Sequence, residues 1–316
     1  MIAHIHHQYI STCDPKWIAN LLVTLAENNH MVDCDPETQE LMEQCVAKHS
    51  GTSDRELIGN ASLYEITSLK RKYLTTIEVD GTFTEDRYLN LFGNPSLVLV
   101  ENGPYEWPVY KMMIDVYKND RKFKNIYAVL LNAVSGRHRT LQELHAGGNG
   151  AFEALIVSKE KSPEYQGLTT LKIYPVTDSD RVSENAGYLP TPKKLYRFFC
   201  GMNSKTDDVD RAYIDTLKQP LYHWHMWRKR AIENYFPPEA FEKINLNVDR
   251  YRNYSIPERY FIRVENEIEG YDKKNLVHVA ESMSRNDYEA ISDKLIIEGE
   301  EMSEIRLFLL KMAKVV

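Results

Sequence analysis

The chain has 316 residues, of which 43% are hydrophobic and 27% charged, and this composition excludes a predominantly disordered protein. Its 39 Lys and Arg side chains face 46 Asp and Glu, which leaves a net charge of −7. No uniformly basic surface is therefore available for nucleic acid, and such binding would need local basic patches.

The sequence also indicates where the protein works. No run approaches the roughly 18 apolar residues that cross a bilayer, and the N-terminus lacks the basic start and apolar core of a secretory signal. The four cysteines form no CxxC pair and are too few for a disulfide framework. We expect a cytoplasmic protein without membrane contact, built from two or three structural units.

Residues 1–92 are expected to form an α+β region that could dock a partner. Apolar side chains at helical spacing predict helices over Trp17–Glu27 and Thr38–His49, and Thr75–Val79 is a predicted strand. The start MIAHIHH places His4 and His6 on one face of an extended segment, followed by His7. This cluster could ligate a metal, whereas the simpler interpretation is a solvated group of histidines.

Residues 93–240 are predicted to form an α/β core, a parallel sheet flanked by helices. The apolar runs of strand length are Ser96–Val100, Ile126–Ala133, Leu171–Thr177 and Tyr196–Cys200. The segments between them are expected to form an exit loop over Glu101–Pro108 and helices over Val109–Lys118 and Ala151–Ser158. A mainly helical pattern follows in residues 241–316.

Acidic and glycine residues stand where predicted strands end. Glu101 follows Ser96–Val100, Asp178 and Asp180 follow Leu171–Thr177, and GGNG (147–150) precedes a predicted helix. Parallel sheets build their sites beyond the carboxyl ends of the strands, and helix N-termini favour anions. Crowded carboxylates without His or Cys favour Mg²⁺ or Mn²⁺, and together with an anion pocket they indicate phosphoryl chemistry.

Each of these signals has an ordinary structural interpretation. A carboxylate at a strand end is commonly a solvated loop residue, and a GG pair is commonly a turn. The order in which the signals occur, a strand with Glu, a glycine turn and a strand with DxD, is more specific than any one of them.

Three segments of the sequence, LVLVEN, HAGGNGAF and YPVTDSDR, resemble the landmarks of a TOPRIM domain. The later WRKRAIENYFP is similar to a segment of the OLD (overcoming lysogenization defect) nucleases, and the resemblance covers about residues 93–285. It implies a TOPRIM-like fold and a Mg²⁺- or Mn²⁺-dependent nuclease that cleaves phosphodiester bonds in antiviral defence.

The resemblance also implies roles for individual residues. The expected catalytic residues are Glu101, Asp178, Asp180, Glu233 and Lys274, or Lys273 in place of the last. The expected metal ligands are Glu101, Asp178, Asp180 and Glu106. Glu106 approximates the family's second acidic position, with a spacing of five residues from Glu101 where the family has four.

Phosphate binding is predicted at glycines and arginines. The candidates are Gly147, Gly148 and Gly150 in the glycine turn, the run Arg228, Lys229 and Arg230, and the cluster Arg137, His138 and Arg139. Each basic cluster could equally be a solvated face.

Missing motifs limit the alternatives. There is no GxxxxGK[ST] loop and no GxSxG elbow, so neither a P-loop ATPase nor an α/β-hydrolase is expected. OLD proteins carry an ATPase before the TOPRIM unit, so the resemblance implies a separate ABC/SMC-like ATPase partner. The alternative is a catalytically silent TOPRIM-like interaction or sensor subunit. A topoisomerase or primase is disfavoured because no swivelling tyrosine domain or zinc module is recognisable.

Overall fold

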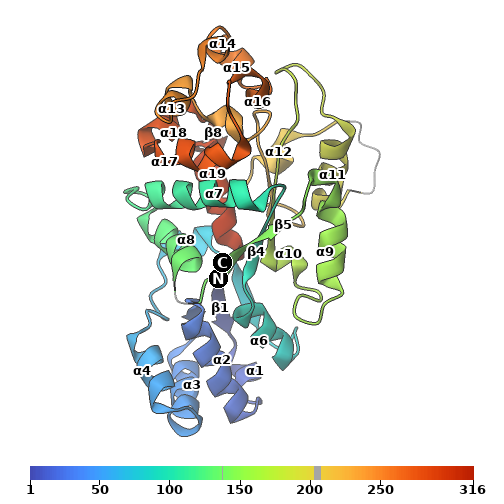
Figure 1. The fold of residues 1–316 in the computed structure, drawn as a ribbon. Coiled ribbons are helices and arrows are strands. Elements are labelled where there is room, and N and C mark those ends of the chain that lie inside the picture. The colour runs from blue at the N-terminus through green and yellow to red at the C-terminus, as the bar shows by residue number, and fades with distance from the viewer. Residues whose placement is uncertain (137, 203–207) are drawn as a thin grey trace.

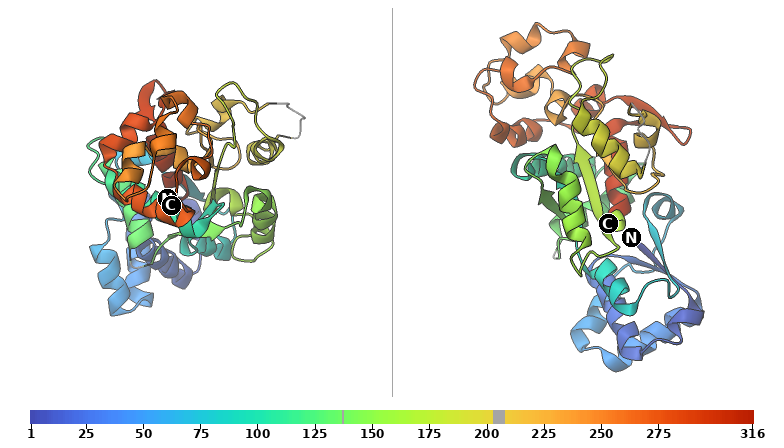
Figure 2. Two further views of the ribbon diagram at one scale, coloured as in Figure 1. Left: turned by 45° about the horizontal axis from the view of Figure 1, so that its top comes forward. Right: turned by 90° about the vertical axis from the view of Figure 1, so that its right-hand side faces the viewer.

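The computed structural model describes residues 1–136, 138–202 and 208–316. Parallel sheets flanked by helices give it an α/β fold, as predicted. The molecule is elongated, with the N-terminal region at one end, a four-stranded sheet in the middle and a mostly helical region at the other end (Figures 1 and 2). The amino group of Met1 donates a hydrogen bond to the carbonyl of Val316, so the two termini lie side by side.

The N-terminal region contains a three-stranded parallel sheet in the order β2-β1-β3. Its strands are β1 (Ile2–Ile5), β2 (Met31–Asp33) and β3 (Thr76–Val79). Its helices are α1 (His7–Ile10), α2 (Pro15–Glu27), α3 (Pro36–His49), α4 (Thr52–Asn60), α5 (Ser68–Tyr73) and α6 (Glu85–Gly93). The two helices and the strand predicted here are therefore confirmed. Asp14 and Asp35 cap α2 and α3, each followed by a proline that needs no N–H partner at that position.

The central sheet is parallel, in the order β5-β4-β6-β7. Its strands are β4 (Ser96–Val100), β5 (Leu141–His145), β6 (Ile173–Thr177) and β7 (His225–Met226). All five residues of β4 are buried, as the continuous apolar run predicted. Val98 and Val100 belong to the core under α7 and α8, and Leu97 and Leu99 to the core under α9 and α11.

Two predicted strands of this sheet are wrong. Ile126–Ala133 lies within helix α8 (Lys124–Ser135), and Tyr196–Cys200 lies within helix α11 (Pro190–Cys200). In α8 the buried residues Ile126, Tyr127, Leu130 and Ala133 recur at helical spacing, which a short apolar run does not distinguish from a strand. One of the two strands that pair with β4 is the edge strand β5, which was not predicted because its exposed Gln142 and Glu143 interrupt any apolar pattern.

The segment after β4 is also a helix where an exit loop was predicted. Helix α7 (Gly103–Tyr117) begins three residues after the strand. Pro104 stands in its first turn, where no N–H is needed, and only Pro108 interrupts the hydrogen bonding. On the other face of the sheet, a 3₁₀ turn η1 (Asn149–Ala151) leads into α9 (Phe152–Glu160), close to the predicted helix. The short α10 (Thr169–Lys172) precedes β6.

The C-terminal part surrounds one buried helix, α19 (Glu304–Met312). The other elements after α11 are α12 (Arg211–Ile214), η2 (Ile232–Tyr235), α13 (Pro238–Glu242), α14 (Asp249–Arg252), α15 (Ile256–Arg259), α16 (Val264–Glu267), η3 (Lys273–Asn275), α17 (Leu276–Glu281), α18 (Arg285–Ile291) and η4 (Ala313–Val315). An antiparallel hairpin, β8 (Lys294–Ile297) and β9 (Glu300–Ser303), interrupts the predicted helical pattern.

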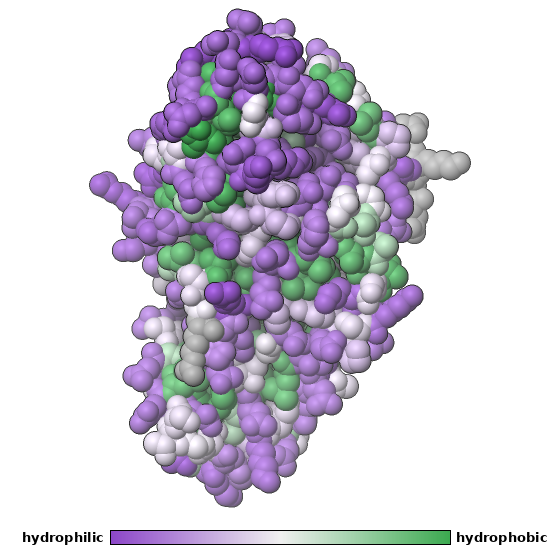
Figure 3. Space-filling view, in the orientation of Figure 1, coloured by the Kyte–Doolittle hydropathy of each residue, from purple (hydrophilic) through white to green (hydrophobic). Residues whose placement is uncertain are grey.

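The outer surface is mostly polar. The face in Figure 3 is largely hydrophilic, with apolar residues mainly across the middle of the molecule. In the part of the chain that the structure describes, no helix combines the length and apolar character needed to cross a membrane. All four cysteines are free thiols.

The packing of α19 gives the first test. Phe308 is fully buried, and its ring lies 4.9 Å from that of Trp227 and 5.1 Å from that of Tyr110. Phe308→Ala should lower the free energy of unfolding by about 3–5 kcal/mol in urea titrations, because it leaves a cavity. Ile296→Ala, at a side chain that is 71% exposed, should change it by no more than about 0.5 kcal/mol. Equal small losses in both variants would contradict this core.

Candidate active site

A polar pocket lies beyond the carboxyl ends of β4 and β6, the edge where a parallel sheet builds its sites. Its volume is about 200 Å³. Its lining residues are Glu101, Asp178, Asp180, Arg230, Ala231, Glu233, Asn234, Ile262, Arg263, Val264, Glu265 and Lys273. Four predicted acidic residues, distant in the chain, therefore meet in one place.

Glu101 enters the pocket directly from β4. The next element, α7, starts at once, and the backbone N–H of Asn102 donates to the Glu106 carboxylate at 3.0 Å. This bond belongs to the first turn of α7, and it holds Glu106 nearly buried beneath the pocket, where Tyr110 also donates to it at 3.4 Å. The one-residue shift in spacing therefore still leaves Glu106 beside the other acids, because a helix and not a loop carries it.

The Asp178–Asp180 segment forms a strained turn. Asp180 has φ of 53°, in the left-handed region that residues other than Gly and Asn seldom adopt. The N–H groups of Ser179 and Asp180 both donate to the carbonyl of Arg230 at 3.1 Å, and the Ser179 hydroxyl donates to the carbonyl of Lys229 at 2.6 Å. These hydrogen bonds connect the turn to the segment that leads to Glu233, and Asp178 and Asp180 both line the pocket.

Glu233, Asn234 and Tyr235, the ENY triplet of the sequence, have different roles within the 3₁₀ turn η2. Glu233 is 4% exposed, and its Oε2 atom is buried without a hydrogen-bond partner among the described residues. Asn234 is structural, since its amide group donates to the carbonyls of Arg259 and Ile262 at 2.7 and 3.0 Å. Tyr235 is fully buried, and its ring packs against that of Trp227.

Of the two candidate lysines, Lys273 lies in the pocket and Lys274 does not. The Lys273 ammonium is 3.4 Å from Glu233 Oε1. Lys274 is 70% exposed and pairs with Asp272 at 3.3 Å. The first choice of lysine was thus wrong for the geometry, because the cap that Asp272 places on η3 turns consecutive side chains to different sides.

The pocket collects negative charge that the protein does not neutralise. Burial raises the pKa of Glu106 to about 7, and the neighbouring Glu233 contributes. Burial also raises the pKa of Asp178 well above its usual value, and the negative charges of Glu106 and Glu233 raise it further. The pKa of Glu101 is raised by burial as well, although Lys273 opposes the shift. The carboxyl groups of this region are those of Glu101, Glu106, Asp178, Asp180, Glu233 and Glu265. Among the described residues, Lys273 is the one basic side chain of the pocket that forms an ion pair with any of them, so a bound cation would relieve their repulsion.

The side chains fit a hard cation through oxygen donors alone. The carboxylates of Glu101, Asp178 and Asp180 have no side-chain hydrogen bond within the described residues, and Glu233 Oε2 is unpaired and buried. They are not drawn together into a preformed cage: in the described part of the chain, the one set of three such side chains with ligand atoms within 4.8 Å of one another is His4, His6 and Glu78. Mg²⁺ needs no such cage, since it keeps several waters and binds through one or two carboxylates.

The basic candidates separate into those near the pocket and those away from it. Arg230 lines the pocket, and its guanidinium contacts only the carbonyls of Arg181 and Phe261. Arg263, which the sequence did not single out, also lines it. No carboxylate pairs with either arginine among the residues described. Both are placed to meet an anion.

Arg228 is wrong as a phosphate ligand. Its guanidinium forms ion pairs with Asp215 at 3.2 Å and Asp293 at 3.1 Å. His138 and Arg139 precede β5 and so lie at the amino edge of the sheet, opposite the acidic pocket. Arg137 lies outside the described residues.

The glycine turn stands at the same carboxyl edge, after β5. Gly147 and Gly148 have φ of 72° and 136°, which require glycine, and the Gly147 N–H donates to the Glu101 carbonyl at 3.1 Å. Space is open around the Cα atoms of Gly147, Gly148 and Gly150. The turn thus lies beside the acids without lining their pocket.

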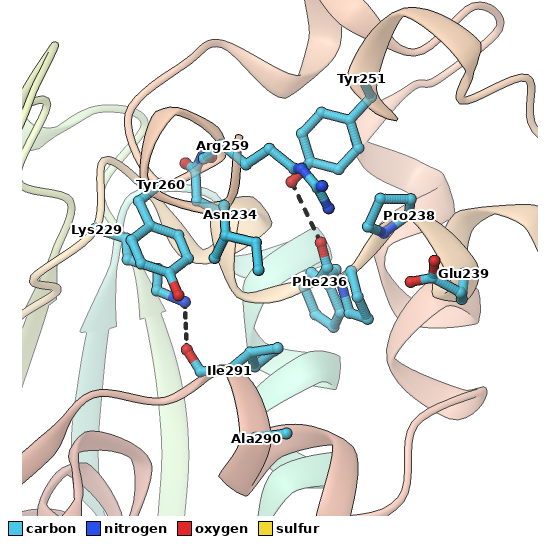
Figure 4. A pocket seen from close by; sticks show the side chains of 12 residues that line it. Lys229, Asn234, Phe236, Pro238, Glu239, Tyr251, Arg259, Tyr260, Ala290 and Ile291 are labelled. Atoms are coloured by element: carbon cyan, nitrogen blue, oxygen red, sulfur yellow. Dashed lines mark hydrogen bonds between the residues drawn. The ribbon is translucent and has the colours of Figure 1, made fainter. Parts of the chain in front are cut away.

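A second cavity of about 320 Å³ adjoins the first through Asn234. In Figure 4, Lys229 donates to the carbonyl of Ile291, and across the cavity Tyr251 donates to the carbonyl of Phe236. Burial lowers the pKa of Lys229 to about 8, and its ammonium lies 3.8 Å from the ring centre of Tyr260. Lys229 is therefore engaged internally and is not a free phosphate contact.

Comparison with models of known protein families, with curated proteins and with solved structures gives no match for this chain.

The raised pKa of Glu106 predicts how stability depends on pH. A carboxyl whose folded-state pKa is about 7 favours folding while protonated, below about pH 4.5, and loses this contribution as pH rises to 7. Glu106→Gln keeps the shape and stays neutral, so at pH 8 without divalent metal it should raise the melting temperature by about 5 °C.

At pH 4 the same variant should melt like the wild type, because both side chains are then uncharged. Calorimetry at the two pH values checks this difference. If Glu106→Gln were less stable than the wild type at pH 8, the ionised Glu106 carboxylate would not be destabilising beside the other acidic residues.

Proposed function

We propose that this chain is a Mg²⁺- or Mn²⁺-dependent nuclease of the TOPRIM type, similar to OLD nucleases, that hydrolyses phosphodiester bonds. One observation carries the proposal: carboxyl groups from the end of β4, from α7, from the end of β6 and from η2 converge at one sheet edge with Lys273 among them. The order of these residues in the sequence is the order of the TOPRIM and OLD motifs. The fold supports it at the level of a parallel sheet flanked by helices.

The residues take the following roles. Glu101, Asp178 and Asp180 would hold the cation, with Glu233 and Glu106 adjoining. Bound Mg²⁺ would supply charge stabilisation and lower the pKa of a water molecule. Burial works to lower the pKa of Lys273, but the carboxylates outweigh it and raise the pKa, so this lysine stays positive beside a phosphate. Arg230 and Arg263 at the rim would contact phosphate oxygens.

The biological setting follows from the resemblance alone. It is that of an effector in antiviral defence controlled by a separate ABC/SMC-like ATPase.

A catalytically silent TOPRIM-like interaction or sensor subunit is the second candidate. It is favoured by the spacing of the acids, which do not bring three ligand atoms within 4.8 Å of one another in the described residues. The net charge of −7 also favours a partner other than bare nucleic acid.

Cleavage assays test the proposal. Purified protein is incubated with supercoiled plasmid or with labelled tRNA in Mg²⁺, in Mn²⁺ or in EDTA, with gels as readout. Nicking or cleavage should require the metal, and Asp178→Asn should lower the rate at least about 100-fold, as loss of several kcal/mol of charge stabilisation would. Asp115→Asn is the matched control, since this half-exposed residue of α7 forms an ion pair with Lys118 and with no other side chain in the described part of the protein.

The lysines give a matched pair in the same assay. Lys273→Ala should lose cleavage because it removes the positive charge among the acids, whereas Lys274→Ala should retain it. Equal rates for wild type, Asp178→Asn and Lys273→Ala would exclude this pocket as the active site. A wild-type chain that cleaves neither substrate, alone or with an ATPase partner, would favour the silent subunit.

A further inference from the structure

A second group of chemically active side chains lies in the N-terminal region, in the sheet β2-β1-β3 (lower part of Figure 1). His4 stands in register with Asp33 on one neighbouring strand and with Glu78 on the other. In parallel strands, residues in register point to the same face. His6 follows β1 directly, so His4, His6, Asp33 and Glu78 all gather at the carboxyl edge of this sheet.

Three of these side chains are close enough to share one ion. The Nε2 atoms of His6 and His4 lie 2.7 and 4.0 Å from Glu78 Oε2, and the ligand atoms of the three residues all fall within 4.8 Å of one another. The imidazole rings meet edge to face, with centres 4.9 Å apart. Ligands on a tetrahedral ion with bonds near 2.0–2.1 Å lie about 3.3 Å apart, so replacing the His6–Glu78 hydrogen bond by a metal needs only a small shift.

Asp33 fixes which nitrogen of His4 is available. Its carboxylate lies 3.1 Å from His4 Nδ1 and is itself held by both guanidinium nitrogens of Arg71. Because Arg71 holds the carboxylate in place, it is positioned to accept a hydrogen bond from His4 Nδ1. The free Nε2 then faces Glu78. A carboxylate behind a histidine in this way is the support that metal-ligating histidines usually have.

His7 is excluded from the group although it adjoins His6 in sequence. Its Nδ1 lies 3.0 Å from the Thr38 hydroxyl and its Nε2 lies 3.5 Å from Glu37, so both ring nitrogens face α3. The structure thus separates a pair of facing histidines from a third that looks equivalent in the sequence.

We propose that His4, His6 and Glu78 bind one divalent transition-metal ion, of which Zn²⁺ is the best fit, with Asp33 orienting His4. Two imidazoles and one carboxylate suit Zn²⁺ and similar borderline metals, whereas Mg²⁺ prefers oxygen donors alone. Three protein ligands leave a fourth position for water or a small anion. The side chains of His4, His6 and Glu78 are 38%, 43% and 52% exposed, so an ion can enter from solvent. This site is distinct from the acidic pocket and does not depend on the proposed nuclease activity.

Metal binding to the full-length, untagged protein tests the proposal. The chain is stripped with chelator and titrated calorimetrically with Zn²⁺ in the presence of millimolar Mg²⁺, which occupies oxygen-only sites. One Zn²⁺ per chain is expected, and Co²⁺ in its place should give visible absorption of a four- or five-coordinate centre. Binding should weaken at acidic pH, because protons compete with the metal for its ligands.

Substitutions identify the ligands. His6→Gln and Glu78→Gln should each abolish stoichiometric binding, and Asp33→Asn should weaken it about 10–100-fold, as loss of a carboxylate behind a metal ligand does. His7→Gln and Asp178→Asn should bind Zn²⁺ like the wild type. Circular dichroism establishes that each variant is folded.

The proposal is overturned if no Zn²⁺ binds to the wild type, or if His6→Gln and Glu78→Gln bind it unchanged. Loss of Zn²⁺ binding in Asp178→Asn would overturn it as well, because it would place the ion in the acidic pocket. Failure of the nuclease assays leaves this result unaffected, since the readout here is metal stoichiometry.

Discussion

Repulsion among buried and half-buried carboxyl groups is the constraint on which the central pocket depends. Glu101, Glu106, Asp178 and Glu233 come from four separate elements, and each raises the electrostatic cost of ionising its neighbours. A fold gains no stability from such an arrangement, because the same positions filled by neutral side chains would avoid the repulsion. The backbone nevertheless holds it firmly: the strained turn at Asp180 is tied to Arg230, and the first turn of α7 is tied to Glu106. Backbone strain and uncompensated negative charge at the carboxyl edge of the central sheet are features typical of a functional site.

Both sheets use the same geometry with different ligands. In each, parallel strands deliver side chains from distant segments to the carboxyl edge, where loops leave room for a ligand. The central sheet collects carboxylates and leaves arginines at the rim, which suits a hard cation and a phosphate. The N-terminal sheet collects two imidazoles and a carboxylate, which suits a softer ion. The chemistry of the donors, and not the fold alone, separates the two sites.

Sequence patterns predicted the parts that depend on local chemistry. The apolar run of β4, the amphipathic α2 and α3, and the acidic residues after β4 and β6 could all be found without coordinates. The runs in α8 and α11 were misassigned because eight or fewer apolar residues satisfy both a buried strand and a buried helix face. The short edge strand β5 and the two-residue β7 gave no pattern, since tertiary pairing alone defines them.

Within the pocket, the sequence did not predict which side chains point toward the acidic residues. The sequence favoured Lys274 over Lys273, whereas in the folded chain Lys273 is the one that faces Glu233. The sequence does not distinguish Arg228 from Arg230 as a phosphate contact. In the structure, Asp215 and Asp293 form ion pairs with Arg228 and not with Arg230 among the described residues. Arg263 carried no signal at all, because it comes from a loop that reaches the pocket by tertiary packing.

The most direct measurement of the central claim is a crystal structure of the chain grown with Mn²⁺, with anomalous scattering recorded at the manganese edge. If the acidic pocket binds a divalent cation, a strong anomalous peak is expected between the carboxylates of Glu101 and Asp178, with both side chains turned toward it. An acidic pocket without a peak, at a manganese concentration that saturates oxygen-ligand sites, would contradict it.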